Sequence, residues 1–184
     1  MTGIRCFVAV DLPDTMREQI RLVQKEIATE GLRFVRPEIM HVTLKFLGVI
    51  PEETLEKVVQ ALKEIRLASF LARAKGMGAF PGRSIRVVWL GLEGDFQSLY
   101  LAVEQALGTF NFPNENRGFS PHVTLGRVGR PKPDTSRAIA SKMERFADLD
   151  LGQFCVDRFF LKKSTLARGG PIYDNIGEYH LRTT

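Results

Sequence analysis

The chain has 184 residues, of which 44% are hydrophobic and 26% charged, so it can bury one sizeable core and is too apolar for intrinsic disorder. Its 26 lysines and arginines exceed its 21 aspartates and glutamates, which suits a small polyanionic partner and excludes the dense basic runs of a DNA-coating protein. No apolar stretch reaches the length of a membrane span, and the N-terminal segment lacks a signal-peptide pattern, so we expect a soluble, cytoplasmic protein.

The first part of the chain alternates strands and helices. Residues 6–10 are predicted as a buried strand, and Pro13 begins a helix with apolar residues spaced by three or four, which Gly31 ends. After a turn at residues 36–37, residues 41–47 form a strand, and Pro51 begins a second amphipathic helix. Strands at residues 70–76 and 85–92 are then expected to form a hairpin around the turn at residues 80–83.

The second part adds two helices and more strands. A helix over residues 95–110 has Phe96, Leu99, Val103 and Leu107 in register and precedes a loop over residues 111–118. A strand at residues 122–128 and a helix at 133–146 follow, and residues 154–162, 164–167 and 173–181 alternate like strands. Because no linker divides the chain, we predict one α+β domain over residues 1–184.

One tetrapeptide occurs twice. The sequence His-Val-Thr-Leu stands at residues 41–44 and again at 122–125, in a chain with three histidines. At average residue usage, a given histidine is followed by Val-Thr-Leu on the order of once in a few thousand cases, so chance is a poor explanation. The separation is close to half the chain, which predicts two pseudo-symmetric halves that present the same strand to a shared central cleft.

The chemistry of this motif points to a phosphate. On a strand, His41 and Thr43 point to one face, and His122 and Thr124 do the same in the other copy. Two imidazoles can serve as a general base and a general acid on opposite sides of a phosphorus atom, because their ordinary pKa lies near neutral pH. The threonine hydroxyls can donate hydrogen bonds to the non-bridging oxygens.

Metal binding by the motif histidines and functional roles for the third histidine and the two cysteines are disfavoured. A metal site is disfavoured because no carboxylate or further histidine stands near either motif at a ligand spacing. His180 has no companion motif and is interpreted as structural. Cys6 and Cys155 share no metal or disulfide spacing and are interpreted as small buried hydrophobes on strands.

Two segments around the motifs resemble a known family. FVRPEIMHVTLKFLG (residues 34–48) and FSPHVTLGR (residues 119–127) look like the signature segments of the RNA 2′,3′-cyclic phosphodiesterases, also called 2′-5′ RNA ligases, of the 2H phosphoesterase superfamily. RCFVAVDLP (residues 5–13), FPGR (80–83) and VWLG (88–91) extend the resemblance over the whole chain. It implies a bilobal α+β fold with antiparallel sheets that line a central cleft, helices outside, and no metal or organic cofactor.

The resemblance also implies the reaction and the roles of the histidines. An RNA 2′,3′-cyclic phosphate would be hydrolysed to a 2′-phosphate, with reversible 2′-5′ joining of RNA ends as a weaker activity. His41 would donate a proton to the departing 3′ oxygen, and His122 would accept the proton of the attacking water. The implied partner is an RNA end bound by a monomer, with no membrane partner.

Three residues after the motifs are further candidates for substrate binding. In the family, the positions of Phe46 and Arg127 help to hold the nucleotide, by stacking and by phosphate pairing. Both stand five positions after a histidine, where strict alternation puts a side chain in the core, so a β-bulge or the end of regular pairing must intervene, which Gly126 would ease. Lys45 shares the parity of His41 and could reach a flanking phosphate.

Two alternatives to an RNA phosphodiesterase remain. The same cleft would serve a cyclic phosphodiesterase for a small nucleotide or an ADP-ribose-type cyclic phosphate, or a nucleotide- or RNA-binding module without turnover. Intact histidines and threonines favour an enzyme over a binder. Basic residues at the rim of the cleft would favour RNA, and the candidates are Arg33, Arg36, Arg83, Arg130, Lys132, Lys162 and Lys163.

Overall fold

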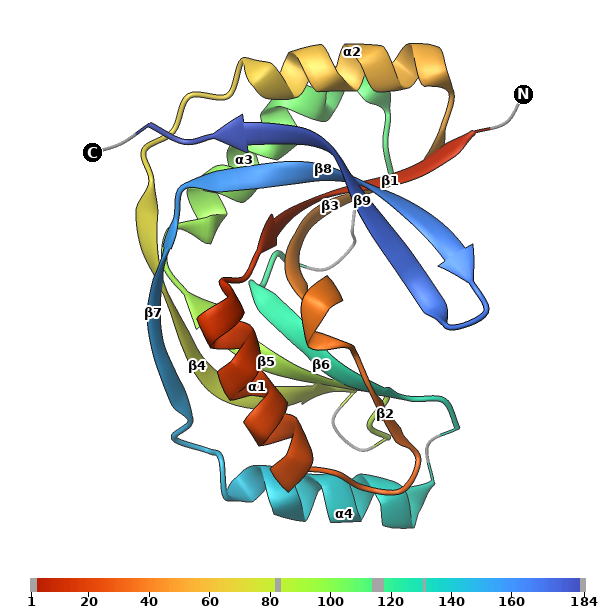
Figure 1. The fold of residues 1–184 in the computed structure, drawn as a ribbon, viewed down its shortest axis with the longest axis vertical. Helices are drawn as coiled ribbons and strands as arrows, with labels where there is room; N and C mark the ends of the chain where they lie inside the picture. Colours follow the sequence, from red (N-terminus) through yellow and green to blue (C-terminus); the bar gives the residue numbers. More distant parts are fainter. Residues whose placement is uncertain (1–2, 82–83, 114–117, 131, 183–184) are drawn as a thin grey trace.

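The computed structural model describes residues 3–81, 84–113, 118–130 and 132–182, which form an α+β fold around one antiparallel sheet (Figure 1). The strands of these described ranges are β1 (Ile4–Asp11), β2 (Leu32–Phe34), β3 (His41–Ile50), β4 (Phe70–Phe80), β5 (Val87–Glu93), β6 (His122–Val128), β7 (Asp150–Val156), β8 (Arg158–Ala167) and β9 (Gly170–His180). The helices are α1 (Asp14–Glu26), α2 (Glu52–Lys63), α3 (Phe96–Leu107) and α4 (Pro133–Glu144), with 3-10 turns at Pro37–Ile39 and Gly108–Phe110.

The nine-stranded sheet consists of two parts that meet at the two motif strands. Its order is β7-β4-β5-β6-β3-β1-β8-β9, and β2 pairs with β6. The joint between the parts is narrow, because β3 and β6 are paired only through Val42 and Val123 among the described residues. Helices α2 and α3 lie over the β1 and β8 part, and α1 and α4 lie against the β4 and β5 part (Figure 1). The predicted hairpin of β4 and β5 is present.

Each half of the sequence lends a helix to the other half of the sheet. Gln24 of α1 is buried, and its side-chain amide donates hydrogen bonds to the carbonyl oxygens of Val35 and Leu125, at 2.8 and 2.9 Å. Glu104 of α3 accepts from the Lys45 ammonium of β3 at 2.6 and 2.8 Å. Both motif strands are therefore held from behind by a helix from the opposite half of the chain.

The apolar spacing predicted the helices well and the strand ends less well. Phe96, Leu99, Val103 and Leu107 of α3 are all buried, as expected. Helix α1 already ends at Glu26, and Gly31, with φ of 84°, lies in the connection to the unpredicted strand β2. The predicted strand over residues 154–162 is two strands, β7 and β8, separated at Asp157. β7 pairs with β4 and β8 pairs with β1 and β9, and alternation along the sequence does not reveal where the chain passes from one part of the sheet to the other.

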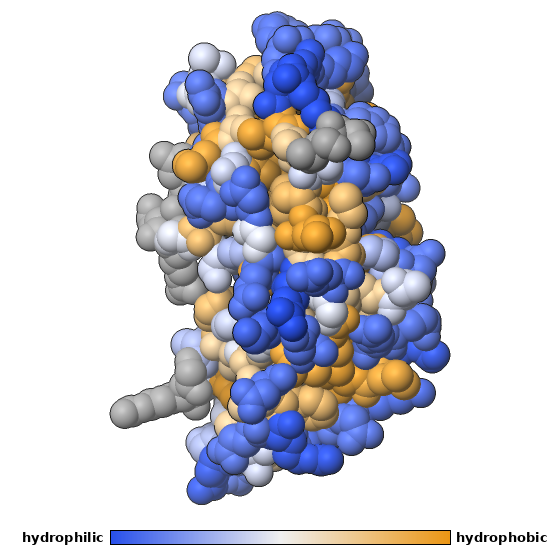
Figure 2. Space-filling model, turned by 90° about the vertical axis from the view of Figure 1, so that its left-hand side faces the viewer, coloured by the Kyte–Doolittle hydropathy of each residue, from blue (hydrophilic) through white to orange (hydrophobic). Residues whose placement is uncertain are grey.

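One cysteine contradicts the sequence interpretation. Cys6 is buried, and burial raises the pKa of its thiol to about 11. Cys155 is exposed, because it lies on the solvent-facing side of the edge strand β7. Figure 2 shows the side of the molecule that carries β7, where patches of hydrophobic residues lie between hydrophilic ones. None of the helices described here is long and apolar enough to cross a membrane.

Candidate active site

The two motif strands have the same pattern of burial. In both β3 and β6, the histidine and the threonine are half-buried, while the valine and the leucine are buried in the core. This alternation follows from the pleat of a strand, since hydrophobic residues at every second position anchor one face to the core. The predicted orientation of His41, Thr43, His122 and Thr124 on one face is confirmed.

The pairing of Val42 with Val123 brings the four polar side chains together. Val42 and Val123 face each other in an antiparallel pair, and each lies between the histidine and the threonine of its own motif. The four polar side chains therefore flank the joint between β3 and β6, and all four line the same cleft. A phosphate in this cleft would meet one imidazole from each motif.

These side chains line one cleft of about 900 Å³. The cleft contains His41, Thr43, His122, Thr124, Phe46 and Arg127, which are six of the seven predicted site residues. Its remaining walls come from β2, the connection to β3, and the tip of the β8–β9 hairpin at residues 167–171. Side chains from both halves of the sequence therefore share one cavity.

Both histidines are oriented by the same backbone contact. Nδ1 of His41 lies 2.8 Å from the carbonyl oxygen of Ile39, and Nδ1 of His122 lies 2.8 Å from that of Ser120. A carbonyl oxygen only accepts hydrogen bonds, so each Nδ1 carries a hydrogen and donates it. Each Nε2 is then left to accept a proton when the ring is neutral and to donate one when it is charged. This arrangement equips either ring as a base or an acid.

Aromatic rings pack against both imidazoles, and these contacts were not predicted from the sequence. The His41 ring lies 4.8 Å from Phe7 and 5.3 Å from Tyr173, between ring centroids. The His122 ring lies 5.6 Å from Phe80 and 6.1 Å from Trp89. The sequence does not show that β1 pairs with β3 and β5 with β6, the pairings that bring Phe7 and Trp89 to the site. Phe80 lies on the strand next to β5, and Tyr173 lies far along the chain.

The environment of His41 favours its neutral form. Burial lowers the pKa of His41 most strongly, and the positive charges of Lys162 and Arg127 lower it further. The hydrogen bond to Ile39 and the charge of Asp11 act in the opposite direction. The imidazole of His41 is thus expected to be uncharged at neutral pH.

A β-bulge at the last residue of each motif determines which way three of the predicted residues point. Leu44 is the extra residue between the pairs Val8–Lys45 and Ala9–Thr43, and Leu125 is the extra residue between Val88–Gly126 and Trp89–Thr124. The bulge reverses the alternation. Phe46, which is 52% exposed, and the exposed Arg127 consequently face the cleft and not the core.

The same bulge makes the prediction for Lys45 wrong. Lys45 is 5% exposed, lies outside the cleft lining and pairs with Glu104 of α3. The bulge turns its side chain away from the histidines, so it cannot reach a phosphate in the cleft. Gly126, at the equivalent position of the second motif, has no unusual φ. It is instead needed for space, because a Cβ there would lie 2.9 Å from Leu32 and 3.1 Å from the carbonyl oxygen of Arg33.

The cleft is strongly basic. It is lined by five arginines and, among the residues that the structure describes, by no aspartate or glutamate; the five are Arg5, Arg33, Arg36, Arg127 and Arg168. Arg33 and Arg36 were predicted for the rim, whereas Arg5 and Arg168 were missed. The other predicted residues do not line it: Arg130, Lys132, Lys162 and Lys163 lie elsewhere, and Arg83 is outside the described residues. His180 is exposed and lies 3.3 Å from Glu178, away from the cleft.

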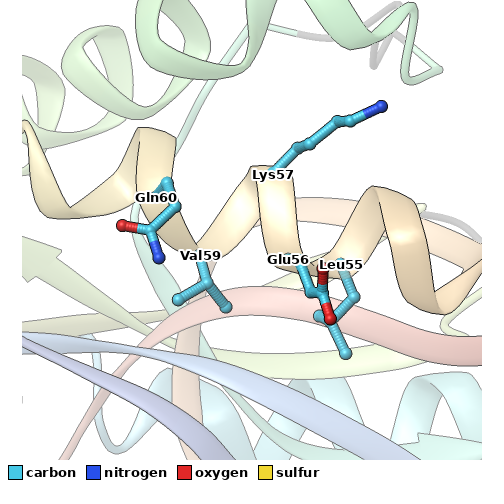
Figure 3. A pocket seen from close by; sticks show the side chains of 5 residues that line it. All are labelled: Leu55, Glu56, Lys57, Val59 and Gln60. Atoms are coloured by element: carbon cyan, nitrogen blue, oxygen red, sulfur yellow. The ribbon is translucent and has the colours of Figure 1, made fainter.

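A second depression has none of this chemistry. It lies on α2 and is lined by Leu55, Glu56, Lys57, Val59 and Gln60, with Lys57 pointing away from the strands (Figure 3). It includes neither histidine. Within the described ranges, no group of three or more His, Cys, Asp and Glu side chains could hold a metal ion.

Comparison with known proteins agrees with this geometry. The family model of LigT-like phosphoesterases matches residues 10–89 and again residues 93–173, so each match contains one His-Val-Thr-Leu motif. The chain belongs to the LigT-like phosphoesterase family, as the resemblance predicted, and is an enzyme of the phosphoesterase class.

Individual relatives cover nearly the whole chain. The RNA 2′,3′-cyclic phosphodiesterase of Archaeoglobus fulgidus is 36% identical over 177 residues, which are 94% of this chain and 98% of that protein. A crystal structure from Thermus thermophilus matches with a TM-score of 0.83 and 30% identity, over 97% of this chain and 98% of that one. Escherichia coli LigT complexed with 3′-AMP matches with a TM-score of 0.79 and 27% identity, over 97% and 98% of the two chains.

Proposed function

We propose that this phosphoesterase hydrolyses the 2′,3′-cyclic phosphate at the end of an RNA to a 2′-phosphomonoester. The observation that carries the proposal is a pair of histidines that line one arginine-rich cleft, each hydrogen-bonded at Nδ1 to a backbone carbonyl oxygen two residues before it. Support also comes from relatives of nearly equal length that are named RNA 2′,3′-cyclic phosphodiesterase.

The proposed roles of the two histidines follow the family resemblance, because the symmetry of the two motifs does not say which histidine is the acid and which is the base. Nε2 of His122 accepts a proton from water, whose oxygen attacks phosphorus while the bond to the 3′ oxygen breaks. Nε2 of His41 donates its proton to that departing oxygen, and the 2′ ester bond stays intact. Thr43 and Thr124 donate to the non-bridging oxygens. With the 5′-hydroxyl of a second RNA in place of water, the same steps form a 2′-5′ linkage, as a weaker activity.

We expect that the bound substrate favours the protonated form of His41, the proposed general acid. The protein's own groups lower the pKa of His41, whereas a general acid must carry a proton. A phosphate anion beside the ring stabilises the imidazolium form and raises the pKa of His41 again. The acid is then formed in the complex, where it is needed.

The arginines support RNA as the substrate class. Five guanidinium groups in one cleft exceed the charge of a single cyclic phosphate, and the phosphates that precede the RNA end would engage the rest. Phe46, which is exposed in the same cleft, is proposed to stack on a base.

We propose that the protein acts as a monomer built as one bilobal domain. The single sheet, and a cleft to which one chain contributes both histidines, support this proposal. We further propose that it acts in the cytoplasm.

The proposal is tested with an oligoribonucleotide that ends in a 2′,3′-cyclic phosphate. The expected product is the 2′-phosphate, and His41→Ala and His122→Ala should each lower turnover by roughly 100-fold or more, the usual contribution of a positioned acid or base. The control is His180→Ala, outside the cleft, which should leave turnover unchanged. A 3′-phosphate product, or near-normal rates in either variant, would contradict the proposal. Parallel assays on a cyclic mononucleotide distinguish RNA from a small substrate.

A further inference from the structure

A buried ion pair lies on the His41 side of the cleft. Lys162 of β8 donates from Nζ to Oδ2 of Asp11 at 2.9 Å and to Oδ1 of Asn175 at 2.6 Å. The ammonium also lies 5.1 Å from the centre of the Phe160 ring. Two of its three N–H donors are therefore used within the protein. The side chains of Lys162 and Asp11 are only 7% and 23% exposed.

This pair has no counterpart beside the other histidine. Asp11 is the direct neighbour of His41 in the pairing of β1 with β3, and β1 and β8 are adjacent in the sheet (Figure 1). The equivalent neighbour of His122 is Gly91 of β5, which has no side chain. The motifs are identical in sequence and burial, so Asp11 and Lys162 break the symmetry of the site.

We propose that the Lys162–Asp11 pair is a positioning pair for His41, which sets the charge of this imidazole and thereby makes the two histidines unequal. The pair acts through His41 and does not itself reach the substrate. Its importance for turnover rests on the proposed function, whereas its effect on His41 does not. A buried ion pair is weak evidence of a purely stabilising role, because desolvation offsets much of the attraction between its charges.

The two members of the pair act on His41 in opposite directions. Lys162 lowers the pKa of His41, with the larger effect, and Asp11 raises it. The other groups that face the ring are Arg127 of β6 and Tyr173 of β9. Arg127 stays charged at all relevant pH values, and burial raises the pKa of Tyr173, so that it stays neutral. Among the described groups that face His41, Lys162 and Asp11 are therefore the pair of opposite charges whose removal should shift the pKa of His41 in opposite directions.

The test is a titration of the histidine rings of the free protein by NMR, assigned with single histidine variants. Lys162→Met removes the positive charge and leaves Asp11 unpaired, so the pKa of His41 should rise. Asp11→Asn removes the negative charge but keeps the side-chain shape and an acceptor for Lys162, so the pKa of His41 should fall. A residue that only stabilised the fold would not produce shifts of opposite sign.

Lys45→Met is the matched control. Lys45 pairs with Glu104 at almost the same burial, 6% and 26% for the two side chains, but on the face away from the histidines. It should destabilise the protein as Lys162→Met does and leave the titration of His41 unchanged. If Lys162→Met does not fold, Asp11→Asn decides alone, because the downward shift is specific to it.

Turnover gives a second readout. In the pH profile of kcat/KM on the cyclic-phosphate oligonucleotide, the inflection that belongs to His41 should move with the NMR titration in both variants. Shifts of His41 in a protein without cyclic-phosphate turnover would support the pair and contradict the proposed function. The inference is overturned if both variants shift His41 in the same direction, or if neither shifts it more than Lys45→Met does.

Discussion

Each histidine of the site is fixed by a carbonyl oxygen two residues before it, from Ile39 or from Ser120. This contact selects the tautomer with hydrogen on Nδ1 and directs the chemistry to Nε2. The turn at residues 36–37 was predicted from the sequence, but the two hydrogen bonds were not. They depend on how the chain turns into the strand, which the sequence pattern left open.

The lowered pKa of His41 predicts an acid-sensitive contribution to stability. Above about pH 6.5, the ring is neutral in both the folded and the unfolded state. As the pH falls below that value, the unfolded state binds a proton that the folded state resists, so the stability of the wild type declines. His41→Asn removes this pH-dependent contribution to stability. The melting temperature of the wild type, relative to the variant, should be lower at pH 5 than at pH 7.5, and an unchanged difference would contradict the assignment.

Arg127 predicts a loss of binding without a loss of stability. It is exposed in the cleft and forms no salt bridge with an acid in the part of the chain that the structure describes. Arg127→Met should keep the melting temperature and weaken RNA binding by about 1.5–3 kcal/mol, the range for hydrogen bonds to charged groups. Arg130→Met, outside the cleft lining, is the control. A destabilised variant with normal specific activity would show that Arg127 has a structural role.

At the scale of elements, the β-bulges at the last residue of each motif determine which of the following side chains face the cleft. The sequence predicted His41, Thr43, His122 and Thr124 correctly, because alternation holds over the first four residues of each strand. It predicted only that Phe46 and Arg127 require an irregularity, and it misplaced Lys45 because a bulge is a relation between two strands. No single strand reveals where its partner slips by one residue.

Gly126 should be replaceable only at a cost in stability. A Cβ at this position meets Leu32 and the backbone of β2 at 2.9 and 3.1 Å, and overpacking of this kind costs about 1–3 kcal/mol. Gly129→Ala is the matched control, since nothing lies within 4 Å of its added Cβ. Urea unfolding should give Gly126→Ala a lower free energy of unfolding than Gly129→Ala. Equal free energies of unfolding would show that β2 moves away without cost.

On the scale of the whole molecule, two sequence halves with exchanged helices form one site. The repeat predicted the symmetry and the shared cleft, and the double match to one family model agrees with it. The exchange of α1 and α3 between the halves was not predictable, because it rests on long-range contacts such as those of Gln24 and Lys45. The same holds for the Arg168 side of the cleft, which the β8–β9 hairpin supplies.

The side chains that line the cleft predict that the enzyme stays active in excess EDTA. The described residues that line it offer two imidazoles and no carboxylate or thiolate, whereas a catalytic zinc usually has three protein ligands. Turnover of the cyclic-phosphate oligonucleotide should be the same before and after dialysis against the chelator. Loss of turnover that zinc or manganese restores would contradict a mechanism of two histidines.

The central claim is that two imidazoles, one on each side of the phosphate, exchange the protons of the reaction. The pH profile of kcat/KM tests it most directly, measured for the wild type, His41→Ala and His122→Ala on the same oligonucleotide. The account predicts a bell for the wild type between about pH 5 and 9, because one imidazole must be neutral and the other charged. Each variant should lose a different limb of the bell. A monotonic wild-type profile, or both limbs persisting in either variant, would contradict the claim.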